Sequence, residues 1–321
     1  MMSTAQASRP PGAWDRLCPL GPRGALLDRS VEVWLAAPEA LAEDGHRLRD
    51  ELSLAEHARM ARFRFERDSE LYLASHVFLR QVLSLYGPHA PAAWQFDTGV
   101  RGRPEIARAQ QPQGARLRFS LSHTHGLVAV AVARGWDVGV DVERHRADLD
   151  VDGLAALALA APERAWHARL GPAERATAFV TLWTVKEAVL KACGAGIGRD
   201  LTRVAVPDGL RAPGEVIARA PGLQHDRAAW TVAFADVHGG YALAVATGGP
   251  LRIGAAPLPA RRLAIYDLRR RPTLAGDAME RAVVRPVRAP PPAVRPVPCG
   301  RPCPSFPTPR APEVPHDIRH P

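Results

Sequence analysis

The stretch TLWTVKEAVLKACGAG, residues 181–196, contains the only two lysines of the chain, Lys186 and Lys191. It belongs to a longer segment in which Pro172 lies near the start and Gly194 follows the last apolar residues, as is typical of the two ends of an α-helix. We therefore predict one long helix over 172–194. In a chain that takes its positive charge almost wholly from arginine, a retained lysine favours a site that needs a compact, mobile ammonium.

Apolar patterns on both sides of this helix predict strands. Residues 116–133 and 230–247 each contain an apolar run, a turn centred on His-Gly, and a second apolar run, which indicates two antiparallel hairpins. Residues 31–36 and 136–143 each predict a further strand. The sequence thus places small antiparallel sheets on both sides of the middle of the chain.

A second helix is predicted after Asp68, which is its expected N-cap. Leu71, Phe78, Val82 and Leu85 follow helical spacing, and the Gly-Pro pair at 87–88 ends the pattern. Each half of the chain then contains one long helix and one hairpin, which is a weak internal repeat.

These elements predict an α+β fold of two similar subdomains, each a helix packed on a small antiparallel sheet, related by pseudo-twofold symmetry. The expected organisation is a loose N-terminal segment (1–30), an N-terminal half (31–135), a C-terminal half (136–249) and a tail (250–321). The tail holds thirteen arginines, five acidic residues and seventeen of the 31 prolines. We expect it to be disordered, because such a composition cannot form a core.

The charge of the chain argues against a general nucleic-acid-binding surface. The tail accounts for eight of the nine net positive charges, so the body is nearly neutral. The four cysteines show no spacing of a disulfide framework or zinc site. Since no apolar stretch reaches the roughly 18–20 residues of a membrane span and the N-terminus lacks a signal-peptide core, we expect a cytoplasmic protein.

Two carboxylates in the predicted strand 136–143 are the first candidates for chemistry. Asp141 and Glu143 lie two residues apart, so their side chains share a face of an otherwise apolar strand. On the predicted helix, Trp183, Glu187 and Lys191 share a face as well. Three carboxylates without histidine or cysteine are oxygen donors suited to Mg²⁺ and a phosphate-containing substrate. The competing interpretation is a solvated strand face and an ordinary helix ion pair.

Other polar residues are weaker candidates for binding a phosphate. Ser122 and His123 lie at the end of a predicted strand, Arg103 lies in a Gly-Arg-Pro loop, and Arg67 lies just before the predicted helix that starts at Asp68. Each of them is also common on an ordinary surface. A catalytic triad of Ser122, His123 and an acid is disfavoured, because adjacent residues on a strand point to opposite faces.

The segments SLSHT (120–124), GVDVE (139–143) and LWTVKEAVLKACGAG (182–196), together with GRP (102–104), resemble the 4'-phosphopantetheinyl transferases. The similarity extends over roughly residues 31–248. The chain most resembles the longer single-chain, surfactin-synthetase-activating type of this family, which serves polyketide synthases and nonribosomal peptide synthetases. The family pattern usually has Gly-Lys-Pro where this chain has Gly-Arg-Pro at 102–104, and it has no counterpart of the tail.

The resemblance implies that phosphopantetheine moves from coenzyme A to a serine of an acyl or peptidyl carrier protein, with release of adenosine 3',5'-bisphosphate. It also implies residue roles: Mg²⁺ ligands Asp141, Glu143 and Glu187; a catalytic base, Glu187; a catalytic and phosphate-binding ammonium, Lys191; and coenzyme A-binding residues Arg67, Arg103, Ser122 and His123, with a looser match at Arg59.

Two other functions stay open at the level of sequence. One is a protein that binds carrier proteins and coenzyme A without turnover, and the other is an interaction module that acts through the arginine-rich tail. For the transferase we expect a monomer that binds neither nucleic acid nor a membrane.

Overall fold

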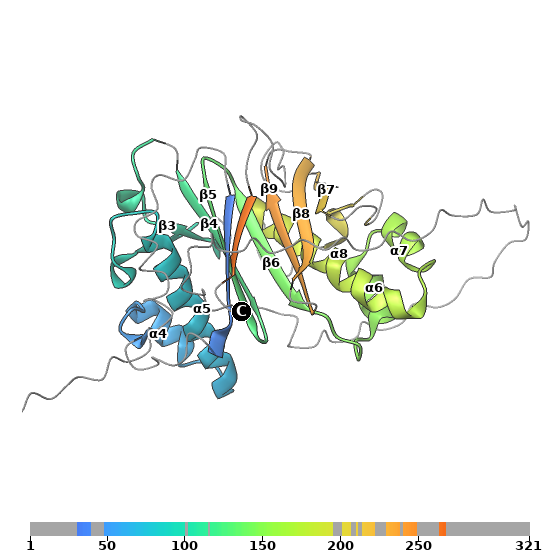
Figure 1. Ribbon diagram of the computed structural model, residues 1–321, viewed down its shortest axis with the longest axis horizontal. Coiled ribbons are helices and arrows are strands. Elements are labelled where there is room, and N and C mark those ends of the chain that lie inside the picture. Colours follow the sequence, from blue (N-terminus) through green and yellow to red (C-terminus); the bar gives the residue numbers. More distant parts are fainter. Residues whose placement is uncertain are drawn as a thin grey trace, which may run out of the picture.

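The strands form two four-stranded sheets and one short two-stranded hairpin (Figure 1). The computed structural model of the protein describes residues 31–39, 48–99, 102–114, 116–194, 201–206, 210, 214–221, 229–237, 240–248 and 263–267. The predicted loose segment 1–30 lies outside the described residues. Within them, no helix combines the length and apolar character that crossing a membrane requires.

The first sheet has the strand order β10-β1-β5-β4. Its strands are β1 (Val31–Ala36), β4 (Leu117–Thr124), β5 (Leu127–Arg134) and β10 (Leu263–Asp267). β5 pairs antiparallel with β1 and with β4, which confirms the predicted strand at 31–36 and the first predicted hairpin.

The prediction of a disordered tail is wrong for five residues. Leu263–Asp267 form β10, which pairs with β1 in parallel from Val31 to Leu35, so this sheet is not wholly antiparallel. Averaging the composition over the whole tail hid the short run LAIYD between its arginines. The other residues of 250–321 lie outside the described part of the chain.

The second sheet is fully antiparallel, with the order β6-β9-β8-β7. Its strands are β6 (Val138–Arg144), β7 (Gly214–Arg219), β8 (Ala229–Val237) and β9 (Tyr241–Thr247). β8 and β9 confirm the second predicted hairpin, and β6 confirms the strand at 136–143. β7 was not predicted. The small third sheet pairs β2 (Phe96–Thr98) with β3 (Pro104–Ile106).

The long helix of the second half is α8 (Pro172–Cys193), and it has the predicted ends. Pro172 is its first residue, and Gly194 follows its last turn in the left-handed conformation with φ 63°. The long helix of the first half is α5 (Glu66–Ser84), whose N-cap is Phe65 rather than Asp68. Asp68 lies within the first turn, where its negative charge stabilises the helix N-terminus without capping it.

The shorter helices complete the two halves. They are α4 (Leu54–Met60), α6 (Val151–Ala158), α7 (Ala161–His167) and the 3₁₀ turns η2 (Pro91–Ala93), η4 (Arg108–Gln110) and η5 (Leu201–Arg203). α4 lies beside α5 at one end of the molecule, and α6 and α7 lie beside α8 at the other end (Figure 1).

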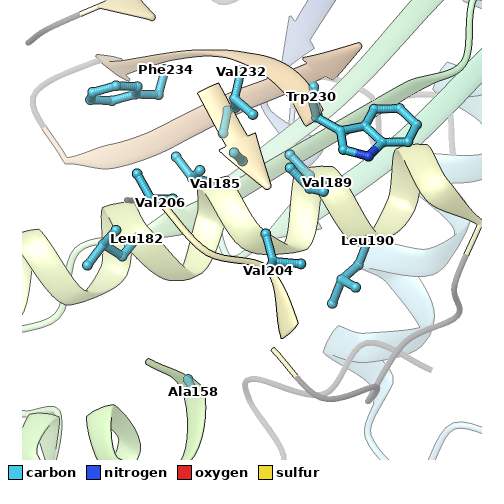
Figure 2. Packing of buried hydrophobic residues seen from close by; sticks show 14 of the residues in the cluster. Ala158, Leu182, Val185, Val189, Leu190, Val204, Val206, Trp230, Val232 and Phe234 are labelled. Carbon is cyan, nitrogen blue, oxygen red and sulfur yellow. The ribbon is translucent and has the colours of Figure 1, made fainter. Parts of the chain in front are cut away.

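The elements stack as helix, sheet, sheet and helix. α5 packs on the outer face of the first sheet, and α8 packs on the outer face of the second, where Figure 2 shows Val185 and Val189 of α8 beside Val232 of β8. The inner faces of the two sheets share a third core, which contains Ala129 of β5 and Val140 of β6. The predicted α+β fold of a helix on a sheet in each half is thus confirmed. The pseudo-twofold relation stays a prediction.

Lys186 of α8 is fully buried and connects α8 with α6, α7 and η5. Its Nζ lies 2.5 Å from Glu163 Oε2 of α7 and donates to the carbonyl oxygens of Ala158 and Leu201 at 3.0 and 3.1 Å. Glu163 in turn accepts from the backbone N–H of Val206 at 2.8 Å. Lys186 therefore has a structural role. Its side chain lies on a different face of α8 from Glu187 and Lys191, which agrees with this role.

Replacing Lys186 with methionine is expected to lower the free energy of unfolding by about 3–5 kcal/mol, because it leaves Glu163 as an uncompensated buried charge. Denaturant unfolding of the full chain measures this. The control is the double variant Lys186→Met/Glu163→Gln, which removes that charge and is expected to recover part of the loss. A single variant as stable as the wild-type protein would contradict the structural role.

Candidate functional site

The two sheets meet where the free edge of β6 lies beside β4. One edge of β6 pairs with β9, and the backbone N–H groups of Val140 and Val142 point the other way. Ser120 Oγ accepts from Val140 N at 3.0 Å, and Ser122 Oγ accepts from Val142 N at 3.3 Å. Side chains of the first half therefore satisfy buried edge amides of the second half, so the two halves are joined along this seam.

Gly139 lets α8 lie unusually close to β6. A Cβ atom on Gly139 would lie 2.0 Å from the Ala188 carbonyl oxygen and 2.4 Å from the Ala192 backbone nitrogen. Since no real side chain tolerates these separations, only glycine fits at this crossing. The close approach brings the C-terminal part of α8, with Glu187 and Lys191, next to the strand that carries Asp141.

A buried carboxylate lies at the centre of this crossing. Asp141 is fully buried, and its Oδ1 accepts from Ser122 Oγ at 2.8 Å and from Lys191 Nζ at 2.6 Å. Lys191 Nζ also donates to Ser122 Oγ at 2.9 Å. The ammonium compensates the buried negative charge, and the hydroxyl bridges both groups across the seam.

The second carboxylate oxygen of Asp141, Oδ2, differs from Oδ1 in its hydrogen bonding. Asp141 Oδ2 is buried and accepts no hydrogen bond from the described residues. A buried carboxylate oxygen without a partner is costly. Because Lys191 and Ser122 engage only Oδ1, Oδ2 remains available to a cation.

The other two predicted carboxylates lie on the same two elements. Glu143 is half-buried on β6, two residues beyond Asp141, and Thr124 Oγ1 donates to its Oε2 at 3.4 Å. Glu187 is 8% exposed on α8, one turn before Lys191. Among the described residues, however, no three histidine, cysteine, aspartate or glutamate side chains are gathered closely enough to hold a metal. A cation would have to draw these carboxylates together around Asp141 Oδ2.

The resemblance implies that Ser122 and His123 both bind coenzyme A, and the structure places their side chains on opposite faces of the first sheet, as expected for adjacent residues of a strand. Ser122 pairs across β5 with Ala129, which belongs to the core between the sheets, whereas His123 pairs with Val128, which belongs to the core under α5. Cross-strand partners share a face, so the two side chains point to opposite faces of the sheet. Ser122 therefore joins Asp141, and His123 does not.

The two predicted arginines have different surroundings. The Arg67 side chain is 71% exposed, and it lies 3.5 Å from Asp68 and over the Phe65 ring. Arg103 instead directs its guanidinium at the backbone carbonyl oxygens of Ala192, Val138 and Phe119. The structure thus places Arg103 next to the crossing and Arg67 on the surface at the start of α5.

Sequence reasoning did not identify Ser120, Thr124 or Gly139 as residues that build the site. A signal was present on β4: Ser120, Ser122 and Thr124 alternate with larger residues, which places three hydroxyls on one face of a buried strand. Gly139 carried a weaker signal, because a glycine within an apolar strand often marks the close approach of another backbone but does not show which element approaches.

Comparison with known proteins connects this arrangement to one family. Residues 137–246 match the pattern of the 4'-phosphopantetheinyl transferase superfamily, and residues 41–134 match that of the 4'-phosphopantetheinyl transferase N-terminal region. The chain is 33% identical over 184 residues to the 4'-phosphopantetheinyl transferase HetI of Nostoc sp., covering 56% of this chain and 76% of that protein. It is 30% identical over 188 residues to a phosphopantetheinyl transferase of Thraustochytrium sp., covering 54% and 64%.

Replacing Gly139 with alanine is expected to lower the free energy of unfolding by about 1–3 kcal/mol, because β6 and α8 must separate to admit the methyl group. The matched control is Gly240→Ala, where an added Cβ meets no atom within 4 Å. Chemical denaturation of both variants tests the expectation. Equal stability of the two would show that the close crossing does not constrain the fold.

Proposed function

The chain belongs to the 4'-phosphopantetheinyl transferase superfamily, and we propose that it transfers 4'-phosphopantetheine from coenzyme A to a serine of an acyl or peptidyl carrier protein. The observation that supports this most is the buried contact between Asp141 and Lys191, bridged by Ser122. It joins three of the segments that resemble the family at one point of the fold.

In the proposed reaction, the oxygen of the carrier serine forms a bond to the β-phosphorus of coenzyme A. The bond from that phosphorus to the oxygen that bridges it to the α-phosphorus breaks. Phosphopantetheine is then attached to the serine, and adenosine 3',5'-bisphosphate leaves with the electron pair of the broken bond. A base must accept the proton of the serine hydroxyl.

Asp141, Glu143 and Glu187 would hold Mg²⁺. Three oxygen donors on two adjoining elements suit this ion, and the buried Asp141 Oδ2 without a hydrogen bond supports a cation there. When bound, the ion would offset the negative charge of the pyrophosphate. Thr124 would orient Glu143 through its contact with Oε2.

Lys191 is suited to bind the phosphates of coenzyme A. An ammonium has three N–H donors, and two of them contact described residues, at Asp141 Oδ1 and Ser122 Oγ. The third can reach a substrate oxygen, because the Lys191 side chain is 14% exposed. The positive charge would then be held by Asp141 while it contacts the group on which negative charge accumulates.

Glu187 would serve as the base for the carrier serine, directly or through a water. It lies on the same face of α8 as Lys191, and it is 8% exposed, so part of it can be reached. Arg67 and His123 are proposed to contact the nucleotide of coenzyme A. Ser122 has its hydroxyl engaged by Asp141, Lys191 and Val142, so its part in binding would be to hold Lys191 in place.

Incubation of the full chain with coenzyme A, Mg²⁺ and apo carrier proteins is expected to add one phosphopantetheine to the carrier, as measured by intact-mass spectrometry. Glu187→Gln is expected to reduce the transfer rate by about 10²–10⁴-fold, because it removes the base, and EDTA is expected to stop transfer.

The matched control is Glu174→Gln, an exposed glutamate in the first turn of the same helix, which should transfer at nearly the wild-type rate. The absence of a mass gain on acyl and peptidyl carriers, with coenzyme A still bound, would contradict the proposal and favour binding without turnover.

A further inference from the structure

Arg103 contacts each of the three elements that carry the site. Its Nη1 donates to the Ala192 carbonyl oxygen of α8 at 2.9 Å, and its Nη2 donates to the Val138 carbonyl oxygen of β6 at 3.0 Å and to that of Phe119 in β4 at 3.4 Å. We propose that Arg103 is a positioning residue, which holds β4, β6 and α8 together so that Ser122, Asp141 and Lys191 meet. The inference rests on the proposed function of that site.

The three carbonyl groups lie close in sequence to the three site residues. Phe119 and Val138 each precede a site residue by three positions on the same strand, and Ala192 follows Lys191 directly. Because strands and helices move as rigid units, a shift of any of these carbonyls displaces the neighbouring functional group. One guanidinium thus links β4, β6 and α8, the three elements that each carry one of the site residues.

The backbone of Arg103 is fixed on its own side. It lies next to β3, whose Pro104 pairs with Thr98 of β2, and the Arg103 carbonyl oxygen accepts from Gly99 N at 2.7 Å. The side chain therefore extends from the turn end of the β2–β3 hairpin to the crossing of β6 and α8. The Arg103 guanidinium also caps α8, because it donates to the Ala192 carbonyl oxygen. That carbonyl lies in the last turn of the helix and lacks a partner within it.

The charge environment of Arg103 fits a buried structural link. Burial lowers the pKa of the guanidinium from its ordinary value, and nearby Asp137 opposes that effect. An arginine remains protonated in proteins, so all its contacts are charge-assisted. Carbonyl oxygens at the C-terminal end of a helix favour such a cation.

This role differs from a contact with the 3'-phosphate of coenzyme A, which the resemblance implies for this position. A phosphate contact would be served well by a lysine. Arg103 contacts the three carbonyl groups through two separate nitrogens of a planar guanidinium, and the single nitrogen of a lysine ammonium does not reproduce that spacing. The two roles therefore predict different results for Arg103→Lys and for a coenzyme that lacks the 3'-phosphate.

The test compares Arg103→Lys, Arg103→Met and the control Arg116→Met in the full chain, with coenzyme A and with 3'-dephospho-coenzyme A. Arg116 is an exposed arginine that pairs with Glu105 on the surface. Both Arg103 variants are expected to lose about 10- to 100-fold in kcat, equally for the two coenzymes and with little change in KM, because misplaced groups slow the chemical step. Arg116→Met should behave as the wild-type protein.

A KM that rises for coenzyme A but not for its dephospho form, together with full activity of Arg103→Lys, would overturn the inference in favour of a phosphate contact. Unchanged kinetics of both Arg103 variants would overturn it as well. No transfer by the wild-type protein would instead refute the proposed function.

Hydrogen exchange decides the inference independently of activity. In Arg103→Met, or in Arg103→Lys if the methionine variant does not fold, the amides of the last turn of α8 should exchange at least about tenfold faster, because this region opens more easily. The amides of α5 should not change. Unaltered exchange at the end of α8 would overturn the positioning role.

Discussion

The buried carboxylate of Asp141 is the constraint on which the rest of the site depends. A fully buried charge requires a compensating group, and Lys191 of α8 supplies it at 2.6 Å. For that ammonium to reach β6, the helix must lie against the strand, and Gly139 is the residue that permits this. Ser122 arrives from the other sheet and completes the arrangement, so the site exists only where both halves of the chain are docked.

The two lysines of this arginine-rich chain have separate tasks, and each uses the small size of an ammonium. Lys186 places its three donors on a carboxylate and two carbonyl groups inside the second half, all within reach of one nitrogen atom. Among the described residues, Lys191 uses two donors to hold Asp141 and Ser122, and in the proposed function the third would contact a ligand. Arg103 joins β4, β6 and α8 through two of its guanidinium nitrogens.

Local patterns predicted the parts of the fold whose signals are local. The ends of α8 follow from Pro172 and Gly194, and the meeting of Asp141 with Lys191 follows from one strand face and one helix face once the two elements pack. The packing of the two sheets against each other was not foreseen. The run LVAVAVA in β5 carried a signal for it, since a strand that is apolar at every position must be buried on both faces. The contacts of Arg103 and the pairing of β10 depend on tertiary placement, for which no local pattern exists.

The central claim is that Asp141 uses its two oxygens differently, with Oδ1 for Lys191 and Ser122 and Oδ2 for a cation. The measurement that tests it most directly is a crystal structure of the full chain with coenzyme A and Mn²⁺, in which anomalous scattering identifies the metal. The account predicts a metal bound to Asp141 Oδ2, with Glu143 and Glu187 drawn to it, while Lys191 remains on Oδ1. A metal bound elsewhere, or one that displaces Lys191 from Asp141, would contradict it.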